Sequence, residues 1–195
     1  MYPDLLTLII FGIVAGFTPG PNNIAASYSG FNFGFKKTIP LMLGVVSGWT
    51  ILLLLMNTGL IIIFRSYPYI QDIIKILGSI FLVYLAYVIA FSQGSQSNKL
   101  KNPVGFLKTF FFQFVNPKGV IVSMFIVSTF INTENYIRDS IIVISYFFFI
   151  AVSSVGSWCL MGKYLRKFAT SEKFIKNFNY TMSFLLIVCV ILFYV

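Results

Sequence analysis

Apolar residues form six long stretches along the chain, separated by short polar segments. The stretches cover Leu5–Ser29, Pro40–Phe64, Ile70–Phe91, Phe110–Ile131, Ile141–Met161 and Tyr180–Val195, and a start nearer Phe174 would bring the last to full length. A helix of about 20 apolar residues crosses the hydrocarbon core of a bilayer. Backbone in lipid must satisfy its own hydrogen bonds, and runs such as Ile51–Met56 lack the alternation of barrel strands. We therefore predict an all-α integral membrane protein with six transmembrane helices.

The composition excludes two other classes of protein. The chain is 58% hydrophobic and only 10% charged, whereas about a quarter of the residues in a soluble domain are charged. Too few polar side chains remain to cover a globule in water, so a cytosolic enzyme is excluded and no catalytic residues are expected. A disordered chain is excluded as well, because disordered segments are poor in aromatic residues and this chain has 23 Phe and 11 Tyr.

The basic residues indicate how the helices are oriented. Fourteen Lys and Arg against five Asp and Glu give a formal charge of +9. Most of the basic residues lie in the first, third and fifth gaps between the stretches: Lys36, Lys37, Lys99, Lys101, Lys108, Lys163, Arg166, Lys167, Lys173 and Lys176. The positive-inside rule places these gaps in the cytoplasm, so both termini are expected outside. The charge thus reflects contact with a lipid bilayer, and no nucleic-acid partner is expected.

A polar linker, Ser92–Asn98, lies close to the midpoint of the chain. We predict one membrane domain over 1–195, with one repeat of three helices over about 1–91, a cytoplasmic linker over about 92–103 and a second repeat over about 104–195. Each half contains an odd number of spans, so the two repeats, if related, are inverted relative to one another. Inverted repeats are common in transporters.

Proline and glycine interrupt the first and fourth stretches at corresponding positions. The first contains Thr-Pro-Gly-Pro-Asn-Asn at 18–23 and the fourth contains Asn-Pro-Lys-Gly at 116–119. Proline removes a backbone donor and clashes with the preceding turn, so we predict that helices 1 and 4 are broken. Paired interruptions in two halves indicate a transport site near the bilayer midplane. The alternative is a simple proline kink that serves packing alone.

The residues at the two breaks are the candidate substrate-binding site. Freed backbone groups and helix N-termini can hold a zwitterionic solute. The candidate residues are Thr18, Pro19, Gly20, Pro21, Asn22, Asn23, Asn116, Pro117 and Lys118. An ionisable group within a span is usually functional, so Lys118 either binds a carboxylate or titrates; the alternative is that it extends to the membrane interface. No Asp, Glu or His is expected deep in any span.

The cysteines do not suggest a metal site or a cofactor. Cys159 and Cys189 stand alone in apolar stretches, and the chain has no histidine, so no metal site of Cys and His ligands is expected. A thiol–disulfide carrier needs two cysteines that can meet, typically one in each broken helix. An exporter of inorganic or metal ions would need Asp, Glu, His or Cys near the breaks. Both remain alternatives to a solute exporter, as does a membrane scaffold without transport activity.

Several motifs together resemble the LysE/RhtB family of amino-acid exporters. They are Gly16–Asn23, Gly34-Phe-Lys36, Gly44 with Gly48, Lys75-Ile-Leu-Gly78, Tyr84-Leu85, Gly105-Phe106 and Gln113–Lys118. The resemblance covers essentially the whole chain. It departs from the common pattern of the third span at Phe81, where the family often has Tyr, and at Ala86, where it often has Gly.

The resemblance implies export of an amino acid or a close derivative across the bacterial inner membrane. In this family export is driven by an ion gradient, usually by proton antiport. The ending Pro-Asn-Asn-Ile at 21–24 is most similar to the cysteine/O-acetylserine branch. The implied partners are a small zwitterionic substrate, a coupling ion and the bilayer, while monomer and homodimer both stay open.

Overall fold

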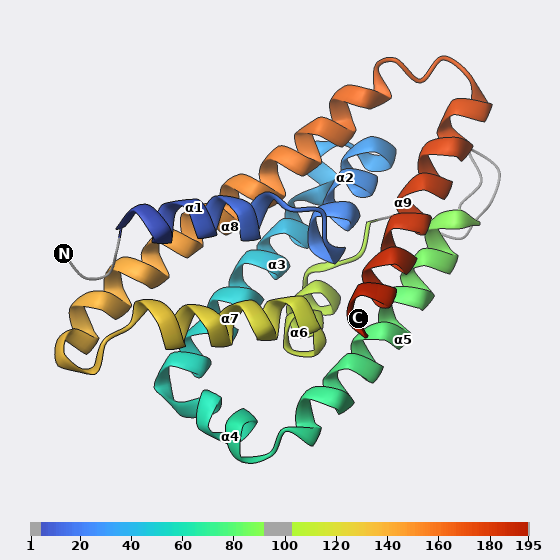
Figure 1. The fold of residues 1–195 in the computed structure, drawn as a ribbon. Coiled ribbons are helices and arrows are strands. Elements are labelled where there is room, and N and C mark those ends of the chain that lie inside the picture. Colours follow the sequence, from blue (N-terminus) through green and yellow to red (C-terminus); the bar gives the residue numbers. More distant parts are fainter. Residues whose placement is uncertain (1–4, 92–102, 195) are drawn as a thin grey trace.

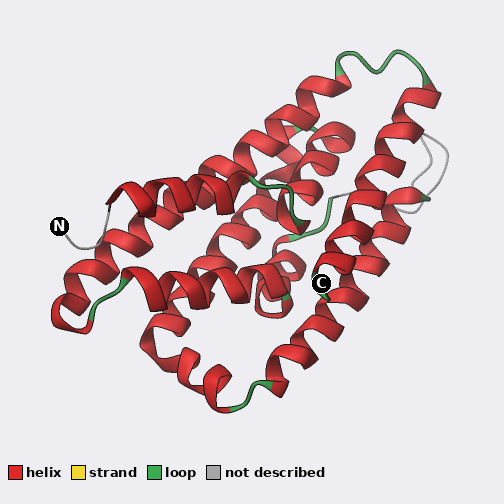
Figure 2. Cartoon of the chain, viewed as in Figure 1, coloured by secondary structure: helices red, strands yellow, loops and turns green. Residues whose placement is uncertain are grey.

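The computed structural model describes residues 5–91 and 103–194. Every regular element in this part of the chain is helical (Figure 2). The α-helices are α1 (Leu5–Phe17), α2 (Pro21–Phe33), α3 (Phe35–Leu55), α4 (Ile61–Ser66), α5 (Tyr69–Ala90), α6 (Phe106–Val115), α7 (Pro117–Phe130), α8 (Tyr136–Arg166) and α9 (Glu172–Leu192). A π-helix, η1 (Met56–Leu60), joins α3 to α4, and a 3-10 turn, η2 (Thr133–Asn135), precedes α8. The predicted linker falls largely on 92–102, outside the described residues.

The helices account for the predicted spans. Four are long and apolar enough to cross a membrane unaided: Phe35–Ser66, Tyr69–Ala90, Thr133–Arg166 and Glu172–Leu192. Two further spans are bent pairs, with α1 and α2 at 52° and α6 and α7 at 61°. The all-α membrane prediction is confirmed, and the two breaks lie at the predicted prolines. The inverted relation of the halves stays a prediction.

The helices extend beyond the apolar stretches that predicted them. The second span begins at Phe35, five residues before Pro40, and the sixth begins at Glu172. Polar helix ends carry no hydropathy signal, but local caps define them: the Ser171 hydroxyl accepts a hydrogen bond from the amide of Phe174 at 3.2 Å, a typical N-cap. The π-helix in the second span was not predicted; Gly59 within it has a φ of 135°, which only glycine adopts without strain.

Three pairs of helices make the most extensive contacts: α2 with α8, α3 with α6, and α5 with α9. In Figure 1, α5 and α9 run antiparallel, side by side. The largest buried cluster draws on α2, α3, α5, α6, α8 and α9, and includes Phe31, Leu82 and Leu186. Two smaller clusters lie around α1, α3, α7 and α8, and around α3, η1, α4, α5 and α7. Helices from both halves of the chain therefore share each buried cluster.

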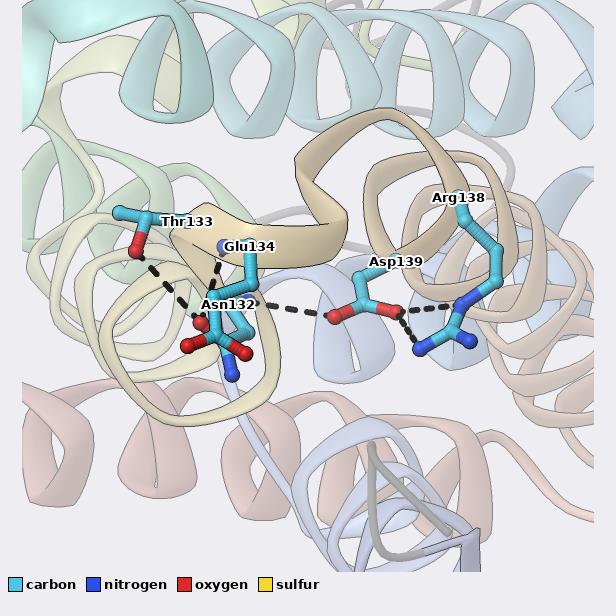
Figure 3. A network of polar contacts seen from close by, with 5 residues as sticks. All are labelled: Asn132, Thr133, Glu134, Arg138 and Asp139. Atoms are coloured by element: carbon cyan, nitrogen blue, oxygen red, sulfur yellow. Dashed lines mark hydrogen bonds and ion pairs between the residues drawn. The ribbon is translucent and has the colours of Figure 1, made fainter.

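One acidic residue lies deeper than expected. Asp139 was expected in a loop, but it lies in the first turn of α8 and is fully buried. Figure 3 shows its carboxylate between the Arg138 side chain and the backbone of Asn132. The Nη2 of Arg138 lies 2.9 Å from Oδ1 of Asp139, and the amide of Asn132 donates to Oδ2 at 3.3 Å. The Asn132 side chain in turn accepts a hydrogen bond from the Glu134 amide at 3.1 Å. These donors allow the carboxylate to be buried where α7 turns into α8.

Replacing Arg138 by alanine is expected to destabilise the protein, because it removes a cation from a buried carboxylate. The free energy of unfolding is expected to fall by about 2 kcal/mol. This lowers the midpoint of thermal unfolding by roughly 4–8 °C in a chain of this size. Thermal unfolding in detergent measures the shift. Arg65→Ala is the control, because Arg65 is exposed and bonds only a hydroxyl, that of Ser128 at 2.7 Å. Equal midpoints for Arg138→Ala and the unmodified protein would contradict the expectation.

Candidate functional site

The first break lies between α1 and α2. Pro19 and Pro21 lack backbone donors, so the regular helical bonding of α1 ends at Phe17. Gly20 is extended, with φ −161° and ψ 173°, and Pro21 is the first residue of α2. Proline is favoured at this position because its missing amide would have no helical partner. The local sequence thus ends one helix and begins another at an angle, instead of merely kinking it.

The carbonyls at the end of α1 have protein donors. Asn23 Nδ2 donates to the carbonyl of Gly16 at 2.7 Å and to that of Thr18 at 3.1 Å. The Ser154 hydroxyl also donates to Gly16, at 2.6 Å, and Trp158 Nε1 donates to the Phe17 carbonyl at 3.2 Å. The carbonyls of Gly16, Phe17 and Thr18 are therefore not free to hold a solute, contrary to what the sequence suggests for the end of this helix. The open groups lie on the helices that begin at the breaks.

The second break lies between α6 and α7. Asn116 has φ −85° and ψ 104°, the extended conformation that a following proline imposes. Pro117 is the first residue of α7, and the amide of Val120 donates to the Asn116 carbonyl at 3.0 Å. Neither α2 nor α7 has a side-chain cap at its N-terminus. Both N-termini therefore keep the partial positive charge of a helix start.

A cavity of about 80 Å³ lies between the two breaks. It is lined from the first break by Gly20, Pro21, Asn22 and Asn23, from the second by Asn116 and Lys118, and elsewhere by residues of α1, α3, α7 and α8. Its apolar wall includes Trp49, Phe147 and Ile150. The space suffices for a small solute, because a single water needs only about 10–15 Å³ on this measure.

Three of the nine candidate residues do not line the cavity. Thr18 and Pro19 are exposed. Pro117 is buried and packs beside Gly78 of α5. These residues shape the breaks, and the other six candidate residues line the cavity.

Lys118 extends from the first turn of α7 across to the other break. Its Nζ donates to the Thr18 carbonyl at 3.2 Å. A Cβ on Gly20 would lie 3.0 Å from this Nζ, so glycine leaves room for the lysine side chain. Among the described residues that line the cavity, Lys118 is the only charged one. Its contact with the Thr18 carbonyl links the two halves of the chain and places a cation at the cavity.

Asn116 presents an unused acceptor. The residue is 2% exposed, and its side-chain Oδ1 is buried without a hydrogen-bond partner. A buried polar atom without a partner is unfavourable by about 1–3 kcal/mol. A solute that donates a hydrogen bond would remove this penalty, so the cavity contains both a cation and a buried acceptor.

Sequence reasoning missed part of this region. The aromatic and aliphatic wall gives no sequence signal, because such residues occur throughout every span. Ser154 is not among the candidate residues, yet it lines the cavity and bonds Gly16 and Asn23. Gln113 was missed as well: it is fully buried in α6 and bonds Asn22. A long amide four residues before a proline, inside an apolar span, was the available signal.

The cysteines lie away from the cavity. Cys159 in α8 and Cys189 in α9 are buried free thiols of the largest cluster, and neither lines the cavity. Within residues 5–91 and 103–194, no three His, Cys, Asp or Glu side chains gather as metal ligands would. The cavity instead offers an ammonium group and amides, which are groups that bind a carboxylate or another polar organic solute.

Comparison with known proteins gives the family. The model of the LysE type translocator family matches residues 13–195. The chain is 27% identical to the cysteine/O-acetylserine efflux protein of Salmonella typhimurium (strain LT2), and 26% identical to that of Escherichia coli (strain K12). Each alignment covers 98% of both chains, and no solved structure matches the chain. The chain therefore belongs to the LysE type translocator family, as a multi-pass transport protein of the bacterial inner membrane and not an enzyme.

Proposed function

We propose that the protein exports a small zwitterionic amino acid, or a close derivative, from the cytoplasm, and that the solute binds in the cavity between the two breaks. The family and the names of the efflux proteins similar to it support export of an amino acid. The observation that carries the proposal is the polarity of the cavity, whose lining includes both Lys118 and Asn116, the residue whose buried amide oxygen has no hydrogen-bond partner.

The carboxylate of the solute is assigned to Lys118. The uncapped N-termini of α2 and α7 begin at this cavity, and helix N-termini attract anions through their free amides and their dipole. The ammonium of the solute is assigned to Asn116 Oδ1, the acceptor that has no partner in the protein. Both ends of an amino-acid backbone then have a counterpart within one small cavity.

The cavity favours a short, uncharged side chain. Its wall is apolar at Trp49, Phe147 and Ile150, and its volume of about 80 Å³ accommodates a solute the size of several water molecules, since one water needs about 10–15 Å³ on this measure. Lys118 would repel a second cation, so lysine and arginine are poor substrates. Cysteine, O-acetylserine and amino acids of similar size fit this description, in agreement with the names of the similar proteins.

The orientation and the energy source belong to the same proposal. The basic residues at the ends of the helices favour a cytoplasmic position for the loops that carry them, with both termini outside. We assign the driving force to proton antiport, as the family resemblance implies. An imposed pH gradient in proteoliposomes tests this assignment: it should drive accumulation of the substrate against its gradient, whereas a sodium gradient should not.

Counterflow in proteoliposomes tests the substrate class. Vesicles loaded with unlabelled alanine, serine or cysteine are expected to take up labelled O-acetylserine, because both solutes use the same cavity. Vesicles loaded with lysine are expected to show no exchange above protein-free vesicles. Exchange with lysine equal to that with the small neutral amino acids would contradict the assignment of Lys118, and no exchange with any small amino acid would contradict the proposed function.

A further inference from the structure

A pair of amide side chains joins the two halves of the chain directly beside the cavity. Asn22 Nδ2 donates to Gln113 Oε1 at 2.8 Å, and Gln113 Nε2 donates back to Asn22 Oδ1 at 3.1 Å. Gln113 is fully buried, and its Nε2 also donates to the Thr109 carbonyl at 2.8 Å. Asn22 lines the cavity and Gln113 does not. The pair therefore connects α2 to α6 just behind the cavity wall.

The pair lies on the side of the cavity that faces the basic end of the molecule. From the first break, α2 leads toward the end where α8 passes into α9, and α1 and α7 lead toward the opposite end (Figure 1). Basic residues concentrate at the first of these ends, with Lys36 and Lys37 after α2 and Lys108 in α6. The amide pair joins α2 to α6 on this side of the cavity.

Backbones approach each other closely on this side. A Cβ on Gly30 of α2 would overlap the carbonyl of Cys159, and one on Gly162 of α8 would overlap the carbonyl of Ser27. A Cβ on Gly48 of α3 would lie 2.6 Å from the carbonyl oxygen of Phe110 in α6. Backbone packed on backbone leaves no room for a solute between α2 and α8 or between α3 and α6 at these contacts.

On the opposite side, the glycines of α1 and α7 face side chains of neighbouring helices. A Cβ on Gly12 of α1 would meet the ring of Tyr146, one on Gly16 would meet the side chain of Ile150, and one on Gly119 of α7 would lie 3.3 Å from Trp49. Side chains change rotamer within nanoseconds when space allows, whereas packed helices move as bodies on a far slower scale. The two ends of the cavity are thus closed in different ways.

We propose that the amide pair of Asn22 and Gln113 is the inner gate of the transport path, with Gln113 as a positioning residue that holds the gate shut. The direction of this gate rests on the proposed function. Single hydrogen bonds between membrane helices are weak, so the pair can open in every cycle. Because Asn22 also lines the cavity, a bound solute contacts the gate directly and can exchange its own polar groups for those of Gln113.

Sided labelling of a cysteine in the cavity tests this proposal. Ala151 lines the cavity, so Ala151→Cys in a Cys159→Ala, Cys189→Ala background reports access by a charged, membrane-impermeant methanethiosulfonate reagent. With the gate intact, labelling from the basic-loop face of sided membrane vesicles is expected to be slow. Gln113→Ala is expected to raise that rate by about tenfold, because removing one partner of a buried pair costs roughly 1–3 kcal/mol. An unchanged rate from that face would overturn the proposal.

Two further variants separate a gate from a structural contact. The exchange Asn22→Gln with Gln113→Asn keeps the two amides and the total side-chain length, so it is expected to restore slow labelling. Asn32→Ala is the matched control: Asn32 Nδ2 donates to Asn179 Oδ1 at 3.0 Å and ties the same helix to α9 outside the cavity. Faster labelling in Asn32→Ala equal to that in Gln113→Ala would show general loosening and overturn the gate. The labelling measurement needs no transport substrate. It therefore tests the gate separately from the proposed function, which counterflow tests.

Discussion

Lys118→Ala is expected to lower the kcat/KM of export by about a hundredfold. A hydrogen bond to a charged group contributes up to about 3 kcal/mol, and every 1.4 kcal/mol corresponds to a factor of ten. Export of the labelled substrate from loaded vesicles measures the change. The loss is expected as a weaker affinity for the substrate, because Lys118 is the charged residue that lines the cavity. Its Nζ donates to the carbonyl of Thr18 at the other break.

The folding of this variant should be unimpaired. A lysine within a membrane span is unfavourable by about 2.5–3.5 kcal/mol on insertion scales, so its removal is expected to leave the thermal midpoint equal or higher. Lys75→Ala is the matched control, since Lys75 lies on α5 and does not line the cavity. Normal export by Lys118→Ala, or an equal loss in Lys75→Ala, would remove Lys118 from the transport mechanism.

The double variant Pro19→Ala, Pro21→Ala is expected to reduce export to the level of protein-free vesicles. Alanine is about 3 kcal/mol more favourable than proline in the interior of a helix, so the two changes favour a continuous helix in place of the 52° bend. Straightening moves Gly20, Asn22 and Asn23 away from Lys118 and closes the cavity. The same export assay measures the loss.

Pro40→Ala controls for the removal of a proline from a span. Pro40 lies inside α3 and does not line the cavity, so its replacement is expected to leave export close to normal. Hydrogen exchange across residues 17–21 shows whether the double variant has become helical there. Unimpaired export by a double variant with a protected, continuous helix would show that the bend is not needed for binding.

The sequence predicts the spans and the breaks well, for simple physical reasons. Lipid requires long apolar helices, and the prolines at 19, 21 and 117 remove helical hydrogen bonds where the helices break, so both features are local properties of the chain. Helix ends are less well predicted, as Phe35 and Glu172 show, because polar turns that extend beyond the apolar stretch resemble loops in hydropathy. The π-helix around Gly59 depends on a backbone conformation that hydropathy does not register.

The candidate site was predicted in part. Residues directly after the prolines, such as Asn22 and Lys118, line the cavity, because a helix that begins at a break points its first turn into the gap. Pro117 is a candidate because it breaks the fourth helix, and it does so, but its side chain packs beside Gly78 of α5 and does not line the cavity. Ser154 and Gln113 reach the region from other helices, and only tertiary structure reveals such contacts.

The central claim is that the solute binds between the two breaks, with its carboxylate at Lys118 and its ammonium at Asn116. Substrate protection of the cysteine in Ala151→Cys tests this most directly, because that side chain lines the same cavity. A saturating concentration of a substrate that has no thiol, such as O-acetylserine or alanine, is expected to slow labelling of this cysteine by about tenfold. Half-maximal protection is expected at the substrate concentration that half-saturates counterflow. Counterflow that saturates while labelling of the cavity cysteine proceeds at its full rate would place the binding site elsewhere and contradict the claim.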